Sequence, residues 1–264
     1  MKPMSLYTYC WMLSFVLSGI VTPSNTHAML EEEKETSLIR IFTGYDKRAP
    51  IGHHICEQSI MEHSTQPVTV VPLYLSTLTG AFDRERTPTQ LTDFTYSRFI
   101  VPYLCDYKGW AIFMDGNDMM ARSDIAKLWK LRDDRYAVMV VKHPEFHGMH
   151  SFMGKEIQTY PMLNWSSMML FNNEKCQKLS REYVHTADYY DLHQFKWLED
   201  DNLIGGLPNT WNHLVSYYEP RPDAALVHWT LGAPYQGGKF AEVEHANEWF
   251  ELYRKTITLP LEQQ

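Results

Sequence analysis

The feature that most constrains the fold is an unbroken apolar segment, Trp110-Ala-Ile-Phe-Met114, which lies between Gly109 and Asp115. A half-buried strand alternates apolar and polar residues, whereas an apolar run of this length needs cover on both faces. The segment Ala137-Val-Met-Val-Val141 has the same character. Strands buried on both faces are typical of a mostly parallel sheet flanked by helices. The two segments therefore predict an α/β fold.

Segments of strand and helix character alternate along the chain from residue 38 onward. Further strands are expected over four ranges: 38–44, 68–73, 165–171 and 225–229. Helices are expected from Pro50, over 94–104 with an interruption at Pro102, after a cap at Ser123, and over 243–257. Residues 76–93 are expected to be a loop, and residues 143–163 to be irregular. This alternation supports the α/β prediction.

The first 28 residues differ in character from the rest of the chain. Lys2 is the only charged residue before an apolar stretch over 11–21, and a polar segment leads on to Ala28. This pattern resembles a secretory signal peptide. It is shorter than the ~20 apolar residues that a membrane span needs. An alternative is that translation starts at Met29. The domain prediction is therefore a leader over 1–28 and a single domain over 29–264.

Composition excludes several classes of protein. The chain has 264 residues, of which 44% are hydrophobic, and this balance rules out a disordered or multi-span membrane protein. The 24 Lys and Arg against 32 Asp and Glu give a net charge of −8, so nucleic acid is not an expected partner. The four cysteines form no CxxC pair. A zinc site built from them, or a disulfide framework, is therefore unsupported, and reduced thiols are expected.

The residues that could carry chemistry directly follow the apolar strand. Asp115-Gly-Asn-Asp118 would lie at the carboxyl end of that strand, where open α/β sheets bind their ligands. Carboxylate oxygens select a hard or borderline cation such as Mg²⁺ or Mn²⁺. His228, at the end of the strand 225–229, is a candidate third ligand. The alternatives are a polar turn that caps the next helix and a hydrogen-bonded core histidine.

Taken in chain order, these segments resemble the GT-A-fold glycosyltransferases. The resemblance is to the glycogenin and lipopolysaccharide galactosyltransferase type, including stand-alone bacterial homologues. The resembling blocks are 41–46, 96–102, 111–118, 164–172, 207–212 and 228–234. They span most of the chain after the leader, and their order makes the resemblance more specific than any one block.

The resemblance implies transfer of a sugar from a nucleotide diphosphate donor with the help of Mn²⁺ or Mg²⁺. It places the metal ligands at Asp115, Asn117 and His228, with Asp118 beside them. It places the nucleotide base and ribose at Tyr45 and Asp46. Further positions implied to be functional are Arg98 and Gly232 at the donor, Asn164 facing the donor sugar, and Gln194 and Asp200 on the acceptor side. Simple packing for Tyr45 and an ion pair for Arg98 are the alternatives.

Three positions depart from the family pattern. Asn117 replaces one carboxylate of the family's DxD motif, for which Asp118 could substitute. His193 stands before Gln194 where the family has an aspartate, so the acidic cluster that includes Asp200 would have to supply the carboxylate. Ala233 replaces a lysine near the phosphates, and the other cations that could take its place are Lys142, Lys155 and Lys239.

The resulting functional prediction is a metal-dependent transferase. It would move a hexose, with UDP as the expected carrier, to a glycan or a lipid-linked acceptor with retention of configuration. Two rivals are a sugar-nucleotide or glycan-binding module that has lost catalysis, and a metal-dependent phosphodiesterase. A nucleotide-sugar donor implies a cytoplasmic enzyme or one at the edge of a membrane, and the signal-like segment leaves export as the alternative.

Overall fold

The computed structural model describes residues 38–258 except 88–89, 145–149, 153–154 and 158–159. For residues 150–152 and 155–157 it describes the backbone only. The expected leader over 1–28 therefore lies outside the described residues. The main sheet has six strands in the order β2-β1-β3-β8-β5-β9. Their bounds are β1 Ile39–Gly44, β2 Val68–Leu73, β3 Trp110–Asp115, β5 Val138–Val140, β8 Met168–Asn172 and β9 Ile204–Gly206. Strand β8 is antiparallel to both of its neighbours, and the other neighbouring strands of this sheet are parallel to each other.

The predicted central strand is confirmed as β3, and every one of its residues is buried. Its side chains alternate between two cores, because successive residues of a strand point to opposite faces. Ala111 and Phe113 belong to one core, and Trp110, Ile112 and Met114 belong to the other. The apolar run at 110–114 is thus explained by cover on both faces of the sheet.

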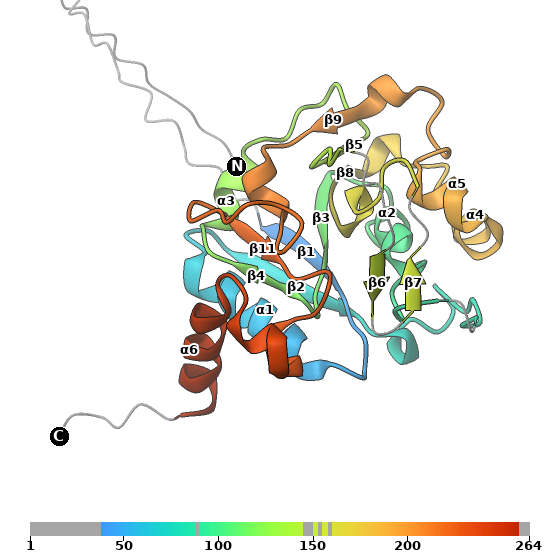
Figure 1. The fold of residues 1–264 in the computed structure, drawn as a ribbon. Helices are drawn as coiled ribbons and strands as arrows, with labels where there is room; N and C mark the ends of the chain where they lie inside the picture. Colours follow the sequence, from blue (N-terminus) through green and yellow to red (C-terminus); the bar gives the residue numbers. More distant parts are fainter. Residues whose placement is uncertain (1–37, 88–89, 145–149, 153–154, 158–159, 259–264) are drawn as a thin grey trace, which may run out of the picture. The chain divides into compact units, whose positions relative to one another are not determined.

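Helices cover the two faces of the large sheet (Figure 1). One face carries α2, α4 and α5, which contribute Val101, Val184 and Leu192 to its core. The other face carries α1 and α3, and α6 packs beyond α1 in a third apolar cluster. The helix bounds are α1 Pro50–His63, α2 Val101–Leu104, α3 Ile125–Trp129, α4 Arg181–Thr186, α5 Tyr189–His193 and α6 Ala246–Ile257.

Two smaller sheets complete the fold. Strands β10 His213–Leu214, β11 Leu226–His228 and β4 Met119–Ala121 form one of them, in that order. Strands β6 His150–Phe152 and β7 Lys155–Ile157 form the other. Because β4 follows β3 after three residues, the small sheet brings the end of β11 next to the end of β3.

Short 3-10 turns join many of these elements. They span Leu75–Thr77, Ser97–Ile100, Trp165–Ser167, Asn173–Lys175, Asp201–Leu203, Asn209–Asn212, Pro234–Gln236 and Gly238–Glu242.

Several predicted boundaries are wrong, each for a local reason. Helix α3 begins one residue later than expected, because Asp124 and not Ser123 is the cap and accepts a hydrogen bond from the Ala126 amide. Pro102 does not interrupt a helix but lies in the first turn of α2, where its missing N–H costs nothing. The strand predicted over 165–171 begins only at Met168, because Asn164 adopts a left-handed conformation that leads into a 3-10 turn.

The ends of two other predicted segments also differ. Residues 143–163 contain the hairpin β6–β7, whose short polar strands give no periodic pattern to recognise. The last helix begins at Ala246 and not at 243, because His245 before it has a φ of 61°. The prediction of unpaired thiols is met at the described cysteines, since Cys56, Cys105 and Cys176 are free and buried.

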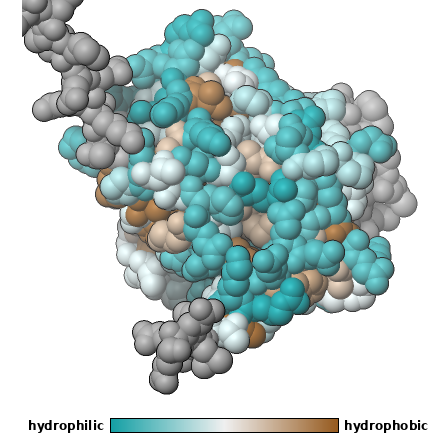
Figure 2. Space-filling view, turned by 90° about the vertical axis from the view of Figure 1, so that its left-hand side faces the viewer, coloured by the Kyte–Doolittle hydropathy of each residue, from teal (hydrophilic) through white to brown (hydrophobic). Residues whose placement is uncertain are grey.

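The face of the molecule that carries α6 is mainly hydrophilic, with apolar atoms in small separate patches (Figure 2). Small scattered patches are usual on a globular protein and give no sign of a docking surface on that face. Within the described ranges, no helix combines the length and the apolar character that a membrane crossing requires.

Candidate functional site

The carboxyl edge of the large sheet gathers most of the predicted site residues. Gly44 at the end of β1 pairs with Asp115 at the end of β3, so the loops that follow these two strands are neighbours. The antiparallel β8 begins at this same edge, since Met168 pairs with Met114. Asn164 precedes β8 and therefore lies at this edge too. The topology thus brings Tyr45, Asp46, Asp115 and Asn164 to one end of the sheet.

Asp115, Asp118 and His228 form a cluster at this edge. One ligand atom from each residue lies within 4.8 Å of the others. The His228 Nε2 atom is 3.5 Å from Asp118 Oδ1. Among the described residues, Asp118 Oδ1 is buried without a hydrogen-bond partner, and the buried Asp115 Oδ1 has only an ion pair with Arg98. Buried carboxylate oxygens that lack partners are costly, so this cluster is suited to hold a cation.

Arg98 balances part of the negative charge. Its guanidinium is buried, and Nη1 lies 3.0 Å from Asp115 Oδ1 as an ion pair. The same nitrogen donates a hydrogen bond to the carbonyl oxygen of Ser166 at 2.9 Å. Burial raises the pKa of Asp115 to about 6, and the Asp118 carboxylate adds to this rise while Arg98 and His228 oppose it. Arg98 therefore outweighs the repulsion from Asp118 but does not offset the cost of burying the Asp115 charge.

A hydrogen-bond network behind His228 fixes how its ring is presented. The Asn212 amide nitrogen donates to Ser167 Oγ at 2.9 Å and to His143 Nε2 at 3.1 Å. The Asn212 Oδ1 atom accepts a hydrogen bond from His228 Nδ1 at 3.0 Å. Burial lowers the pKa of His143 to about 3, so this ring is neutral and can accept that bond. His228 consequently turns its Nε2 toward Asp118.

The His228 Nε2 and Asp118 Oδ1 atoms face one another, 3.5 Å apart. A proton or a metal ion between them would satisfy both. Sequence reasoning did not assign a role to Asn212 or His143. The signal for Asn212 was its place in the block 207–212, whereas His143 fell in a segment with no pattern.

Asn117 does not point into the carboxylate cluster. Its side-chain oxygen accepts a hydrogen bond from the Asp46 amide at 2.9 Å, and its side-chain nitrogen donates to the carbonyl oxygens of Asp46 and Ala49. These bonds join the turn after β3 to the loop after β1. Gly52 allows this close contact, because a Cβ there would lie 1.9 Å from the Asn117 carbonyl oxygen.

The loop after β1 is built around the Asp46 carboxylate. This group accepts hydrogen bonds from the Arg48 side chain and from the backbone amides of Arg48 and Asp93. These donors hold the pKa of Asp46 below its usual value, although burial opposes them. The Tyr45 ring is only half-buried and makes edge contacts with His53 and Tyr74, with ring centres 5.0 Å apart in each case. Tyr45 thus keeps a partly exposed ring beside the cluster.

His193 stands at the position where the resemblance to glycosyltransferases led us to expect an aspartate. It is buried, its Nε2 donates to the carbonyl oxygen of Thr95, and its Nδ1 accepts from Ser166 Oγ. Burial holds the pKa of His193 well below its usual range, and the neighbouring Arg98 lowers it further. His193 is therefore neutral, and its hydrogen bond with Ser166 helps to position the residue whose carbonyl oxygen Arg98 contacts. Gln194, the next residue, is the C-cap of α5.

Asp200 lies away from this edge, so the expectation that it belongs to the same site is wrong. It caps the turn that leads into β9, and its carboxylate accepts a hydrogen bond from the Asn202 amide. Ile204 at the start of β9 pairs with Val138, which lies near the amino end of β3 in the register. Asp200 is thus at the opposite end of the sheet from Asp115, and it is exposed.

The remaining predicted residues are Gly232 and the three candidate lysines. Gly232 comes four residues after His228, has a φ of 151°, and lies against the Phe240 ring, which a Cβ there would approach to 2.4 Å. Lys142 is the second residue after the strand β5 and is exposed, with its Nζ 5.8 Å from the centre of the Trp165 ring. Lys239 lies over the Phe240 ring. The side chain of Lys155 lies outside the described residues.

Solved structures show the same fold at low sequence identity. WbbM, titled a bifunctional glycosyltransferase, superposes with a TM-score of 0.52 and 17% identity, over 82% of this chain and 49% of its own. The chain thus spans about half the length of WbbM. The galactosyltransferase LgtC, solved with donor and acceptor sugar analogues, gives a TM-score of 0.50 and 10% identity, over 85% of this chain and 98% of its own. These similarities show the GT-A fold.

Sequence similarity identifies one relative at much higher identity. No protein-family model matches the chain. Protein CDI of Arabidopsis thaliana is 39% identical over 234 residues, which cover 84% of this chain and 89% of the Arabidopsis protein. The chain therefore belongs to the family of Arabidopsis Protein CDI, and it has the GT-A fold of glycosyltransferases.

Proposed function

We propose that the chain is a metal-dependent glycosyltransferase. It would move a hexose from a nucleotide diphosphate sugar, with UDP as the nucleotide, to a glycan or lipid-linked acceptor. The observation that carries the proposal is the cluster of Asp115, Asp118 and His228 at the carboxyl edge of a GT-A sheet. Ligands of open α/β sheets bind at this edge.

The donor atoms of this cluster fit a divalent metal ion. Two carboxylate oxygens and one imidazole nitrogen suit Mn²⁺, and Mg²⁺ is the alternative. Carboxylate oxygens of Asp115 and Asp118 would become its ligands. A bound divalent ion would neutralise the diphosphate as it leaves. In this proposal Asn117 positions the loop after β1 and does not bind the metal.

The residues around the cluster would hold the rest of the donor. The loop with Tyr45 is joined to the metal-binding turn by Asn117, so a base packed on Tyr45 would place its phosphates near Asp115. Arg98 would keep Asp115 charged and ready to bind metal. Lys142, which is exposed, would contact a phosphate oxygen.

Asn164 and Gln194 are the residues we propose to face the transferred sugar and the acceptor. Asn164 is half-buried, and its backbone is fixed because its carbonyl oxygen accepts a hydrogen bond from Ser167 Oγ at 2.6 Å. Retention of configuration remains part of this proposal. A cytoplasmic location or one at a membrane edge is also proposed, because a transferase needs access to its nucleotide sugar.

One observation favours a second function, which is binding without turnover. The neutral, buried His193 takes the place of the family's acid, and Asp200 is too distant to supply a carboxylate to the reaction centre. A chain with a complete metal site and no acid at the acceptor side could bind a nucleotide sugar and not transfer it. Turnover of the donor separates the two functions.

Thermal unfolding with UDP tests the donor site. A ligand that binds only the native state at 100 times its Kd stabilises it by about 2.7 kcal/mol. We expect UDP and Mn²⁺ together to raise Tm by several degrees, and we expect the Asp115→Ala variant to show no such rise. A rise with UDP alone that survives in this variant would contradict a metal–nucleotide site.

A further inference from the structure

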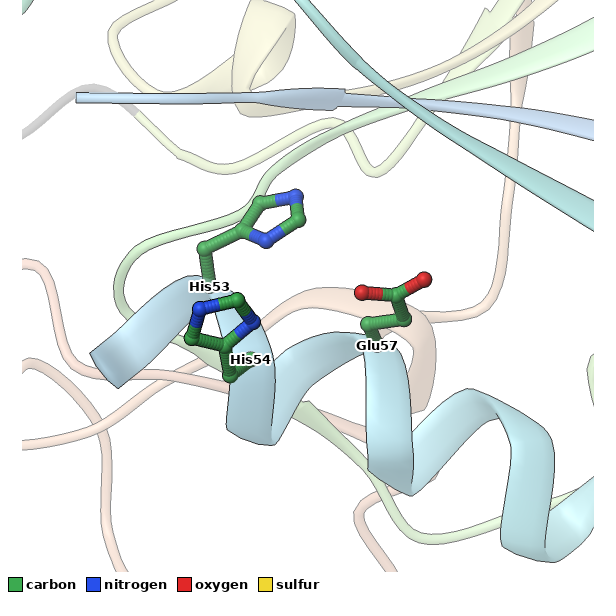
Figure 3. A group of neighbouring side chains, drawn as sticks. All are labelled: His53, His54 and Glu57. Carbon is green, nitrogen blue, oxygen red and sulfur yellow. The ribbon is translucent and has the colours of Figure 1, made fainter. Parts of the chain in front are cut away.

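A second group of metal-binding side chains lies on helix α1. His53, His54 and Glu57 each offer one ligand atom, and these atoms lie within 4.8 Å of one another. Residues three and four apart on a helix share a side, which brings Glu57 next to the two histidines. In Figure 3 the edge of the His53 ring that carries Nδ1 faces His54 and Glu57.

His53 is the buried member of the group, with 2% of its surface exposed. Its Nε2 lies 2.8 Å from Thr43 Oγ1, on the strand β1. Its Nδ1 is buried and has no hydrogen-bond partner within the described part of the chain. A buried polar atom without a partner carries a desolvation penalty, so an unpartnered Nδ1 beside two potential ligands calls for an explanation.

The contact with Thr43 gives His53 the arrangement of a metal-binding histidine. Such histidines donate their second ring nitrogen to a neighbouring oxygen, which fixes the tautomer and the ring orientation. If Nε2–H donates to Thr43 Oγ1, then Nδ1 carries a free lone pair. That lone pair is directed at the space between the exposed His54 and the half-buried Glu57.

We infer that His53, His54 and Glu57 form a binding site for one Zn²⁺ ion. Two imidazoles and one carboxylate are ligands that zinc accepts, whereas Mg²⁺ and Mn²⁺ prefer oxygen. Zinc bonds of about 2.0–2.1 Å bring ligands in a tetrahedral site to roughly 3.4 Å from each other. His54 and Glu57 reach this separation by side-chain rotation, because neither is held in a buried contact. The fourth position faces solvent and takes a water molecule.

The zinc site is separate from the carboxylate cluster but adjacent to its loops. The His53 ring packs against Tyr45, with ring centres 5.0 Å apart, and against Gly116, where a Cβ would lie 3.0 Å from His53 Cδ2. The two sites share no ligand. Zinc binding at α1 therefore does not depend on the proposed glycosyltransferase activity.

Calorimetric titration of the full chain with Zn²⁺ tests this site. The titrations are made in the Asp118→Asn background, because zinc also accepts the carboxylates and the imidazole of the other cluster. This chain is expected to bind one equivalent of zinc at α1. His54→Ala and Glu57→Gln are expected to weaken this binding by at least about tenfold, and Thr43→Val by about 10–100-fold. His63→Ala removes an exposed histidine from the same helix and leaves the affinity unchanged.

X-ray absorption at the zinc edge identifies the ligands directly. Two nitrogen ligands at about 2.0–2.1 Å are expected in the wild type, and one fewer in His54→Ala. The inference is overturned if the wild type binds no zinc. It is also overturned if His54→Ala binds zinc as tightly as the wild type while Asp118→Asn abolishes it. Circular dichroism of the variants at exposed positions shows that each has folded.

Discussion

The side chains of Asn212 and His228 are joined by a hydrogen bond in which His228 Nδ1 donates to Asn212 Oδ1 at 3.0 Å. This bond determines which ring nitrogen faces the carboxylates. Asn212 is itself held by Ser167 and by the neutral ring of His143. The network therefore presets His228 as a ligand before any ion arrives, which reduces the reorganisation that metal binding requires.

Replacing Asn212 is expected to weaken metal binding without removing a ligand. In Asn212→Ala, His228 loses its acceptor, and the affinity for Mn²⁺ should fall by about 10–100-fold. Asn212→Asp retains an acceptor for His228 and should lose less. Electron paramagnetic resonance of free Mn²⁺ measures both affinities. Equal affinity in Asn212→Ala and the wild type would show that the bond does not position His228.

Asp118→Asn is expected to separate stability from metal binding. The Asp118 carboxylate contributes to the raised pKa of Asp115, so its removal relieves repulsion in the metal-free protein. The metal-free variant should therefore be more stable than the wild type by about 0.5–2 kcal/mol. Its Tm should no longer respond to Mn²⁺. Denaturant unfolding with and without Mn²⁺ measures both effects, and a destabilised variant that still responds to Mn²⁺ would refute the assignment.

Metal affinity is expected to depend on pH through Asp115. Its pKa is raised to about 6, so protons compete with Mn²⁺ below that pH. The affinity should be constant above about pH 7 and should fall by roughly tenfold per pH unit well below pH 6. The stability of the metal-free protein depends on pH in the opposite direction. Because the pKa of Asp115 is 3.8 in the unfolded chain and about 6 in the folded one, the folded state loses stability as the pH rises from about 4 to 6. Calorimetry at pH 5, 6 and 7 checks the first effect, and a flat affinity profile would argue against Asp115 as a ligand.

Much of the fold followed from apolar patterning. The run at 110–114 predicted a strand covered on both faces, and β3 has this environment because helices lie on both sides of the sheet. The hairpin β6–β7 and the short helices α4 and α5 were not predicted. Elements this short are fixed by tertiary contacts more than by periodicity, since a few residues do not define a period.

The sequence indicated which residues form the candidate site better than it indicated how their side chains are oriented. Sequence order indicated Asp115, Asp118 and His228, which the fold brings together. It could not show that Asn117 would turn to bond the loop after β1, because an amide serves equally as a metal ligand or a backbone partner. Asp200 was expected near the reaction centre from its distance in sequence to Gln194, but β9 enters the sheet from the opposite end.

The contact between α1 and the turn after β3 gives a prediction about stability. A Cβ on Gly52 would lie 1.9 Å from the Asn117 carbonyl oxygen, so Gly52→Ala must displace the metal-binding turn. We expect a loss of about 1–3 kcal/mol in unfolding free energy and weaker Mn²⁺ binding. Gly206→Ala is the matched control, since nothing lies within 4 Å of its added Cβ. Denaturant unfolding of both variants measures the difference, and equal stabilities would contradict this packing.

The most direct test of the central claim is release of UDP from a panel of UDP-hexoses by the full chain. The account predicts slow release of UDP that requires Mn²⁺, rises when a glycan or lipid-linked acceptor is added, and is lost in Asp115→Ala. UDP and Mn²⁺ binding without release of UDP from any donor would contradict transfer and favour the binding function. Metal-dependent hydrolysis of simple phosphodiesters, with no effect of a sugar acceptor, would contradict the glycosyltransferase assignment.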